Sequence, residues 1–178
     1  MTLLTLLFIL RIIHDLATAT LVGSVIFNYF LLRPALRLIP PAHAVVIAQR
    51  VGNLFTYTGW TALVLLFLSG LLRLYYTGRL WFILTLDLYA HGPGRSLALM
   101  ILFWFITVVS STIMTFALRP KLMKKLMVSS NPTLADVEKR RTTQMTASSW
   151  LDWLQLLNVI TSTLALIAGV SIVYGGLF

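Results

Sequence analysis

Three polar side chains near the start of the chain, Arg11, His14 and Asp15, interrupt a long apolar run. Ionisable groups inside such a run are costly to keep there and are functional candidates by default. Arg11 and Asp15 stand four residues apart, so they can pair on one helix face with His14 beside them. His14 is the natural ligand for haem or a transition metal, because no other histidine is expected within an apolar span. The alternative places all three groups at the lipid headgroup level, where they cost little.

A second pair of potential ligands, Asp87 and His91, belongs to a later connection between apolar segments. If this connection reaches the side of His14 and Asp15, two imidazoles and two carboxylates could together bind a divalent transition metal. We therefore predict His14, Asp15 and His91 as candidate metal ligands, and His14 as the candidate haem ligand. In the alternative interpretation His91 is an ordinary solvated loop residue. His43 is expected on the opposite side and cannot join them.

Other kinds of site are not indicated by the sequence. The chain has no cysteine, which excludes disulfides, thiolate metal sites and covalent c-type haem. Met123 and Met127 stand four residues apart and could bind copper(I), but methionine is also an ordinary packing residue, which is the interpretation we prefer. The sequence contains no nucleophile–base set, no HExxH motif and no glycine-rich phosphate loop. We expect a protein without catalysis of its own, and predict no catalytic residue.

Apolar helices must position these residues. Of 178 residues, 58% are hydrophobic and 11% are charged, whereas soluble domains carry about 45–50% and about 25%. Hydrophobic runs of about 20 residues, the length that crosses a bilayer, occur at about 12–32, 54–75, 97–118 and 151–177. We predict an all-α polytopic membrane protein, a single four-helix transmembrane bundle over residues 1–178. Soluble enzymes and secreted disulfide scaffolds are excluded.

The distribution of positive charge predicts how the bundle sits in the membrane. The net charge is +9, and ten of the 14 Lys and Arg residues lie in two connections, residues 33–50 and 119–149. Positive residues favour the cytoplasmic side, so both termini are predicted on the outer side, with 119–149 as a basic cytoplasmic connection. Because the cations are divided among loops and helix ends, no nucleic-acid-binding face is expected.

Proline and glycine predict the form of two connections. Pro34, Pro40 and Pro41 predict a kinked loop with little regular structure after the first span. The aromatic-rich stretch 80–89 is too short to span, and is predicted as a short interfacial helix ended by a turn at residues 91–94.

Polar residues along the spans indicate how the helices end and pack. Thr133 followed by Asp136 predicts the start of a polar helix that leads into the fourth span and projects into the cytoplasm. Arg73 and Asp152, at predicted span ends, are expected to extend to water. No internal repeat stands out. Small residues on three spans predict close packing with hydrogen bonds across the bundle: Ala19, Gly23, Ser110, Ser111, Asn158 and Thr161.

The sequence resembles the copper-resistance D family of bacterial membrane proteins in three segments. They are RIIHDLATATLVGSVIFNYFLLRPAL, AQRVGNLFTYTGWTALVLLFLSGLLRLY and FALRPKLMKKL. The shared pattern is a histidine near a helix start, a small-residue stretch, a bulky run to a Leu-Arg-Pro exit, and a later helix that ends in Ser-Gly, here Ser69 and Gly70. The resemblance implies a protein of the bacterial inner membrane that acts in copper handling or as a non-catalytic accessory protein of a membrane complex.

The chain is also similar to HemJ-type protoporphyrinogen oxidases, four-helix proteins with a haem-binding histidine in the first span. Only His14 carries over from either family, and the implied cofactor is copper or haem b. A further alternative is a structural subunit of a larger electron-transfer or photosynthetic membrane assembly, because small-residue faces and exposed aromatic residues make a good packing unit. The expected partners are the lipid bilayer and other membrane protein subunits.

Overall fold

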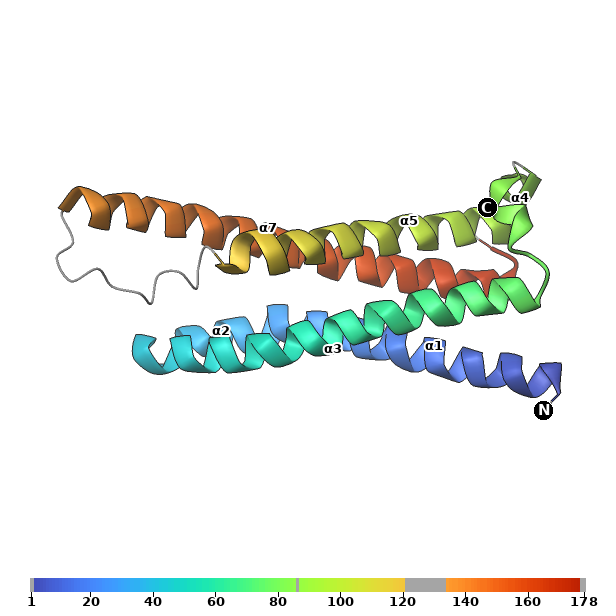
Figure 1. Ribbon diagram of the computed structural model, residues 1–178, viewed down its shortest axis with the longest axis horizontal. Coiled ribbons are helices and arrows are strands. Elements are labelled where there is room, and N and C mark those ends of the chain that lie inside the picture. Colours follow the sequence, from blue (N-terminus) through green and yellow to red (C-terminus); the bar gives the residue numbers. More distant parts are fainter. Residues whose placement is uncertain (1, 86, 121–133, 177–178) are drawn as a thin grey trace.

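The computed structural model describes residues 2–85, 87–120 and 134–176, which form an elongated helical bundle (Figure 1). Its long helices are α1 (Leu3–Ile26), α3 (Pro41–Tyr76), α5 (Gly92–Thr112) and α7 (Leu134–Ser171). No strand occurs among the described residues. Four helical stretches are long and apolar enough to cross a membrane: Leu3–Arg37, Val46–Tyr76, Gly92–Leu118 and Met145–Tyr174. The predicted all-helical class and the four apolar spans are therefore confirmed.

The long helices pack as two antiparallel pairs. α1 lies along α3 and α5 lies along α7, while contacts between α1 and α7 join the pairs. The beginning of α1, the end of α7 and α4 (Asp87–Ala90) lie at one end of the bundle, which we call the terminal end (Figure 1). The opposite end holds the starts of α3 and α7. A buried cluster joins α1 to α3 and consists of Ala17, Leu21, Ala62, Leu63 and Leu66.

The first span continues through its proline instead of breaking there. α1 passes through a π-helical segment (Phe27–Leu32) into α2 (Arg33–Arg37), which has Pro34 in its first turn. Proline lacks an N–H, and its ring clashes with the carbonyl four residues back in an α-helix. The wider π turn relieves this conflict, since its hydrogen bonds reach five residues back. The predicted kinked loop is therefore wrong for Pro34 and is confined to residues 38–40.

The connection at the terminal end is helical, but it ends differently from the prediction. It forms a short 3-10 helix (Trp81–Leu84) and the single turn α4. The predicted terminating turn at residues 91–94 instead starts α5, with His91 as the N-cap and Pro93 in the first turn. Proline fits there because the first N–H groups of a helix have no intrahelical partner. The third helix therefore begins at Gly92.

α7 extends past the other helices at the opposite end (Figure 1). The predicted helix start at Thr133 lies outside the described residues, and α7 begins directly after it at Leu134. The part of α7 before Met145 precedes the apolar span and is about 16 Å long at 1.5 Å per residue. The predicted projection of the fourth helix beyond its span is thus confirmed.

A repeat relates the two helix pairs, contrary to the expectation of none. α5 ends, as α1 does, in a six-residue π-helical segment, Ile113–Leu118. Each π segment is followed by arginine and proline, so the sequence Phe-x-Leu-Arg-Pro-x-Leu occurs twice, at Arg33 and at Arg119. The motif is short and the remaining helical sequence differs, which is why the sequence did not reveal the repeat. Its structural consequence, the π turn, makes it visible.

The repeat extends to the helix contacts at the other end of the bundle. Met100 of α5 is the repeat equivalent of His14 of α1, because the two are separated by the same number of residues as Arg33 and Arg119. A Cβ built on Gly70 of α3 would lie 3.6 Å from Cε1 of His14, and one built on Gly169 of α7 would lie 3.4 Å from Sδ of Met100. Both pairs therefore bring a long side chain of the first helix against a glycine of the second.

Candidate functional site

The site centres on His14, where α1 packs against α3. The Nδ1 atom of His14 is 2.8 Å from the hydroxyl oxygen of Ser69. That hydroxyl lies 2.6 Å from the carbonyl oxygen of Leu65, to which it donates its proton. A serine hydroxyl has only one proton, so Ser69 accepts a hydrogen bond from His14 and Nδ1 carries the imidazole proton. The Nε2 atom of the neutral ring is then left with a free lone pair, the form in which imidazole binds metals.

The residues of α3 that face His14 explain the Ser-Gly pair in the sequence. Ser69 is buried, with 2% of its surface exposed, and it fixes the ring orientation. Gly70 faces the ring, and a Cβ built there would make ordinary van der Waals contact with the imidazole. A ligating histidine typically has such a partner for its second nitrogen, which orients the ring and sets the tautomer. Ser69 was not predicted as a site residue.

Charged residues surround His14 on its terminal side. Arg11 and Asp15 form the predicted pair, with Nε and Oδ2 3.7 Å apart and both side chains more than half exposed. Arg73 is half-buried and lies one helical turn beyond Ser69 on α3. His14 is thus the innermost member of a polar group at the terminal end.

The spacing of charges along the helices places this group at a membrane boundary. On three of the four long helices an uncharged stretch separates two charged residues: Asp15 from Arg33, Arg50 from Arg73, and Arg95 from Arg119. At 1.5 Å per residue these stretches are about 25–35 Å long, close to the roughly 30 Å of a hydrocarbon core. His14 lies at the terminal edge of this apolar band, while Ser69 lies one turn inside it on α3.

The other predicted metal ligands do not gather around His14. His91 is an exposed N-cap residue of α5 whose side chain makes no capping hydrogen bond, and the side chain of Asp87 lies outside the described part of the chain. Within that part, no three His, Asp or Glu side chains are grouped to hold a metal ion. A metal centre that used Asp15 or His91 beside His14 would therefore require these side chains to move toward it. His43 lies in the first turn of α3, at the opposite end as expected.

Small polar residues form a seam between α5 and α7, as predicted for these two spans, whereas Ala19 and Gly23 of the first span are exposed and do not form the predicted packing face. Thr107 and Thr161 lie with their hydroxyl oxygens 2.8 Å apart. The amide of Asn158 accepts a hydrogen bond from Ser110 and donates one of 3.3 Å to Ser111. Because the polar groups of these side chains hydrogen-bond to one another, they hold α5 and α7 together and are not available for a ligand.

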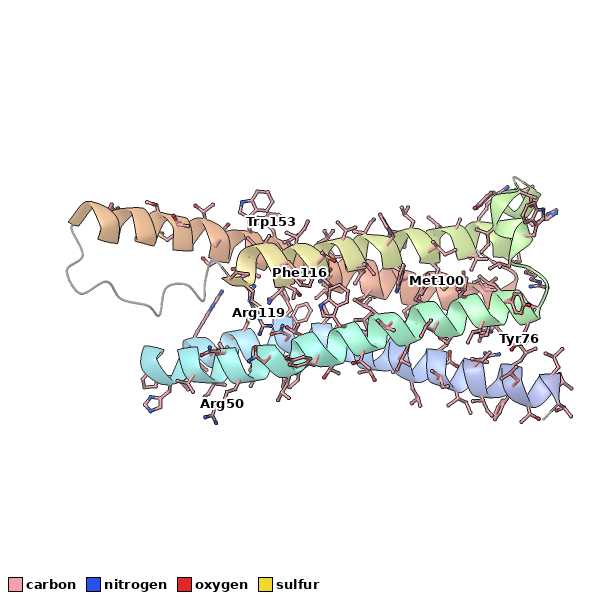
Figure 2. The ribbon with its side chains drawn as sticks, in the orientation of Figure 1. Arg50, Tyr76, Met100, Phe116, Arg119 and Trp153 are labelled. Atoms are coloured by element: carbon pink, nitrogen blue, oxygen red, sulfur yellow. The ribbon has the colours of Figure 1, made fainter. Side chains whose placement is uncertain are left out.

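Two arginines link the helix pairs at the opposite end. Arg33 of the first pair forms an ion pair with Asp152 of α7. Arg119, at the end of the second π segment, donates from Nη1 to Thr56 at 2.8 Å and from Nη2 to Asn53 at 2.6 Å, both on α3. Each arginine therefore binds a helix of the other pair, and Figure 2 shows Arg119 between its own helix and α3. Asp152 is about half exposed, and in addition to the expected extension to water it pairs with Arg33.

Aromatic side chains fill the space between α3 and α5. Phe67 stacks on Trp104 with ring centroids 5.5 Å apart, and the indole N–H of Trp60 donates to the hydroxyl of Thr115 at 3.3 Å. Trp60 also lies against Phe116, which is labelled in Figure 2. These large rings keep the two helices apart, whereas α1 and α7 approach each other closely.

A cleft of about 480 Å³ at the opposite end offers no alternative centre. Its lining consists of Leu118, Thr142, Thr143, Thr146, Ala147 and Trp150. None of these side chains titrates near neutral pH or is a usual metal ligand, so the cleft does not indicate acid–base or metal chemistry.

Comparisons of the chain with protein-family models, with curated proteins and with solved structures found no match.

Proposed function

We propose that the chain is a non-catalytic integral membrane protein that handles copper, with Nε2 of His14 as its ligand atom. The observation that carries this proposal is the 2.8 Å hydrogen bond between Nδ1 of His14 and the hydroxyl of Ser69. Because that hydroxyl donates its proton to the carbonyl oxygen of Leu65, it accepts from His14. This contact fixes the imidazole in the tautomer that leaves Nε2 free to bind a metal before any ligand arrives. Imidazole is a suitable donor for copper in either oxidation state.

The position of His14 supports a role at the membrane surface. It lies at the terminal edge of the apolar band, so an ion can reach it from the aqueous side without crossing the hydrocarbon core. Asp15 and His91 belong to the same end of the molecule and are the candidates for further donors. The resemblance to the copper-resistance D family points to the same chemistry, and to the bacterial inner membrane as the location.

Haem b is the second candidate, favoured by the isolation of His14 from other ligating side chains. Within the described residues no further His, Asp or Glu completes a three-ligand group. Haem needs only one or two axial ligands, because its macrocycle supplies the other four donors to iron. A single imidazole with Nδ1 held by Ser69 fits that requirement. Bound haem would supply the redox chemistry on which a HemJ-type protoporphyrinogen oxidase depends.

The test is the cofactor content of the protein purified in mild detergent from cells supplied with copper and with a haem precursor. Elemental analysis measures copper, and a reduced-minus-oxidised spectrum detects haem b. We expect about one copper or one haem per chain in the wild type. His14→Ala should lose it, because the ligand atom is removed.

His43→Ala is the matched control, because it removes an exposed histidine from the opposite end of the bundle. It should retain the wild-type content. His91→Ala should weaken binding if that imidazole completes the centre. A wild-type protein without copper or haem would contradict the proposal, and so would equal losses in His14→Ala and His43→Ala.

A further inference from the structure

The two arginines that follow the π segments are equivalent in the repeat, but among the described residues only Arg33 has an acidic partner. Arg33 pairs with the carboxylate of Asp152, and its guanidinium also lies 5.6 Å from the centre of the Tyr29 ring. A carboxylate and an aromatic face both stabilise a cation where water is scarce. The side chain of Arg33 is accordingly only 22% exposed.

Arg119 has neutral partners on α3. Its contacts are the hydroxyl of Thr56 and the amide oxygen of Asn53. In the repeat, Asn53 of α3 is equivalent to Asp152 of α7, because each stands the same number of residues before the equivalent glycine, Gly70 or Gly169. The amide of Asn53 therefore occupies the place of the carboxylate of Asp152. The ion pairs of the described residues do not include Arg119. The described part of the chain therefore holds this guanidinium in place without a carboxylate that balances its charge.

The location of Arg119 indicates what could balance that charge. It is half-buried and follows the last residue of the uncharged stretch of α5, at the edge of the apolar band. Phospholipid phosphates lie at this depth of a bilayer. A guanidinium has five N–H donors, and Thr56 and Asn53 use one each, which leaves three for an anion. Its planar fork matches two oxygens of a phosphate.

We propose that Arg119 binds the phosphate group of an anionic phospholipid, with Thr56 and Asn53 holding the guanidinium in place. The lipid supplies the negative charge that Asp152 supplies to Arg33. Free inorganic phosphate presents the same oxygens, so the test separates the two sources. This site lies at the opposite end from His14, and it stands whether or not His14 binds copper or haem.

The experiment measures lipids retained by the purified full-length protein. The protein is placed in nanodiscs with equal amounts of phosphatidylglycerol and phosphatidylcholine, then released for native mass spectrometry. Arg119→Gln removes the cation, and Asn53→Asp gives it an internal carboxylate of the same shape. Arg50→Gln is the control, since it removes an exposed cation from the same end that points away from Arg119 across α3 (Figure 2).

We expect the wild type to retain phosphatidylglycerol in preference to phosphatidylcholine. Arg119→Gln and Asn53→Asp should each lower this retention about fivefold, the effect of about one charge at the membrane surface. Arg50→Gln should change it less than twofold. If millimolar inorganic phosphate displaces the lipid from the wild type, and itself binds in an Arg119-dependent way, the phosphate site is supported and its ligand is the free anion. Equal retention in Asn53→Asp and the wild type would overturn the proposal.

Discussion

At the scale of single residues, one hydrogen bond gives His14 its chemical character. The hydroxyl of Ser69 donates its proton to the carbonyl of Leu65, so Nδ1 of His14 must be the donor in the hydrogen bond between His14 and Ser69. A histidine without such a partner exchanges between tautomers and presents either nitrogen. The contact thus converts a general metal-binding residue into one with a defined ligand atom.

The first prediction concerns Ser69. Ser69→Ala removes the acceptor for Nδ1 and should weaken binding of copper or haem about 10- to 100-fold, the usual effect of losing the partner of a ligating histidine. The affinity is measured by titrating the ligand into purified apoprotein.

Ser162→Ala is the control for Ser69→Ala, because Ser162 is equally buried but bonds only to a carbonyl of its own helix. It should leave the affinity unchanged. Equal affinities of Ser69→Ala and the wild type would show that the hydrogen bond does not prepare the ligand.

The sequence predicted some of these residues and not others, for a physical reason. His14 and the pair of Arg11 with Asp15 could be predicted, because they depend only on residue type and on spacing within one helix. Ser69 and the partner of Asp152 could not, because a contact between helices depends on how each helix is rotated and shifted against its neighbour.

At the scale of helices, the polar seam between α5 and α7 should contribute measurable stability. Asn158 is 3% exposed and contacts both Ser110 and Ser111. Asn158→Ala should lower the free energy of unfolding by about 1 kcal/mol, the size found for hydrogen bonds between membrane helices. Unfolding in mixed micelles of rising sodium dodecyl sulfate, followed by circular dichroism, measures it.

Thr20→Ala serves as the reference for Asn158→Ala, since Thr20 is exposed and bonds only to the carbonyl of Leu16 in its own helix. Its change in unfolding free energy should be under about 0.5 kcal/mol. A loss for Asn158→Ala no larger than that for Thr20→Ala would mean that the seam does not hold the pair together.

The helices also show where proline rules need structural context. The sequence correctly indicated four spans and the extension of the fourth helix beyond its span. It placed a break at Pro34, because proline usually ends an α-helix. The π segment lets the helix continue past the proline, and the same solution recurs before Pro120. Whether a proline ends a helix or is preceded by a π segment is visible only in the backbone structure.

At the scale of the whole molecule, the positive charges predict the orientation in the membrane. The opposite end, with the richer supply of Lys and Arg, should face the cytoplasm. Because the chain has no cysteine, single cysteines report accessibility without background. Thr77→Cys at the terminal end should react with an impermeant maleimide in intact cells, whereas Ser148→Cys should react only after permeabilisation. The reverse pattern would contradict the predicted orientation.

The mass of the native particle decides between a protein that acts alone and a subunit. If the copper-handling proposal is right, gentle detergent extraction should yield a particle of one chain, or of a small number of identical chains. Multi-angle light scattering combined with peptide mass spectrometry measures this. A large particle with fixed companion polypeptides would instead favour the structural subunit of a larger membrane assembly.

The most direct test of the central claim is the nitrogen NMR spectrum of His14 in protein labelled with ¹⁵N-histidine, assigned through His14→Ala. In the ligand-free protein we predict a protonated Nδ1 and an unprotonated Nε2. Addition of copper(I) or haem should shift or broaden the Nε2 signal of His14 and leave His43 unchanged. A proton on Nε2, or an Nε2 signal of His14 that neither ligand alters, would contradict the account.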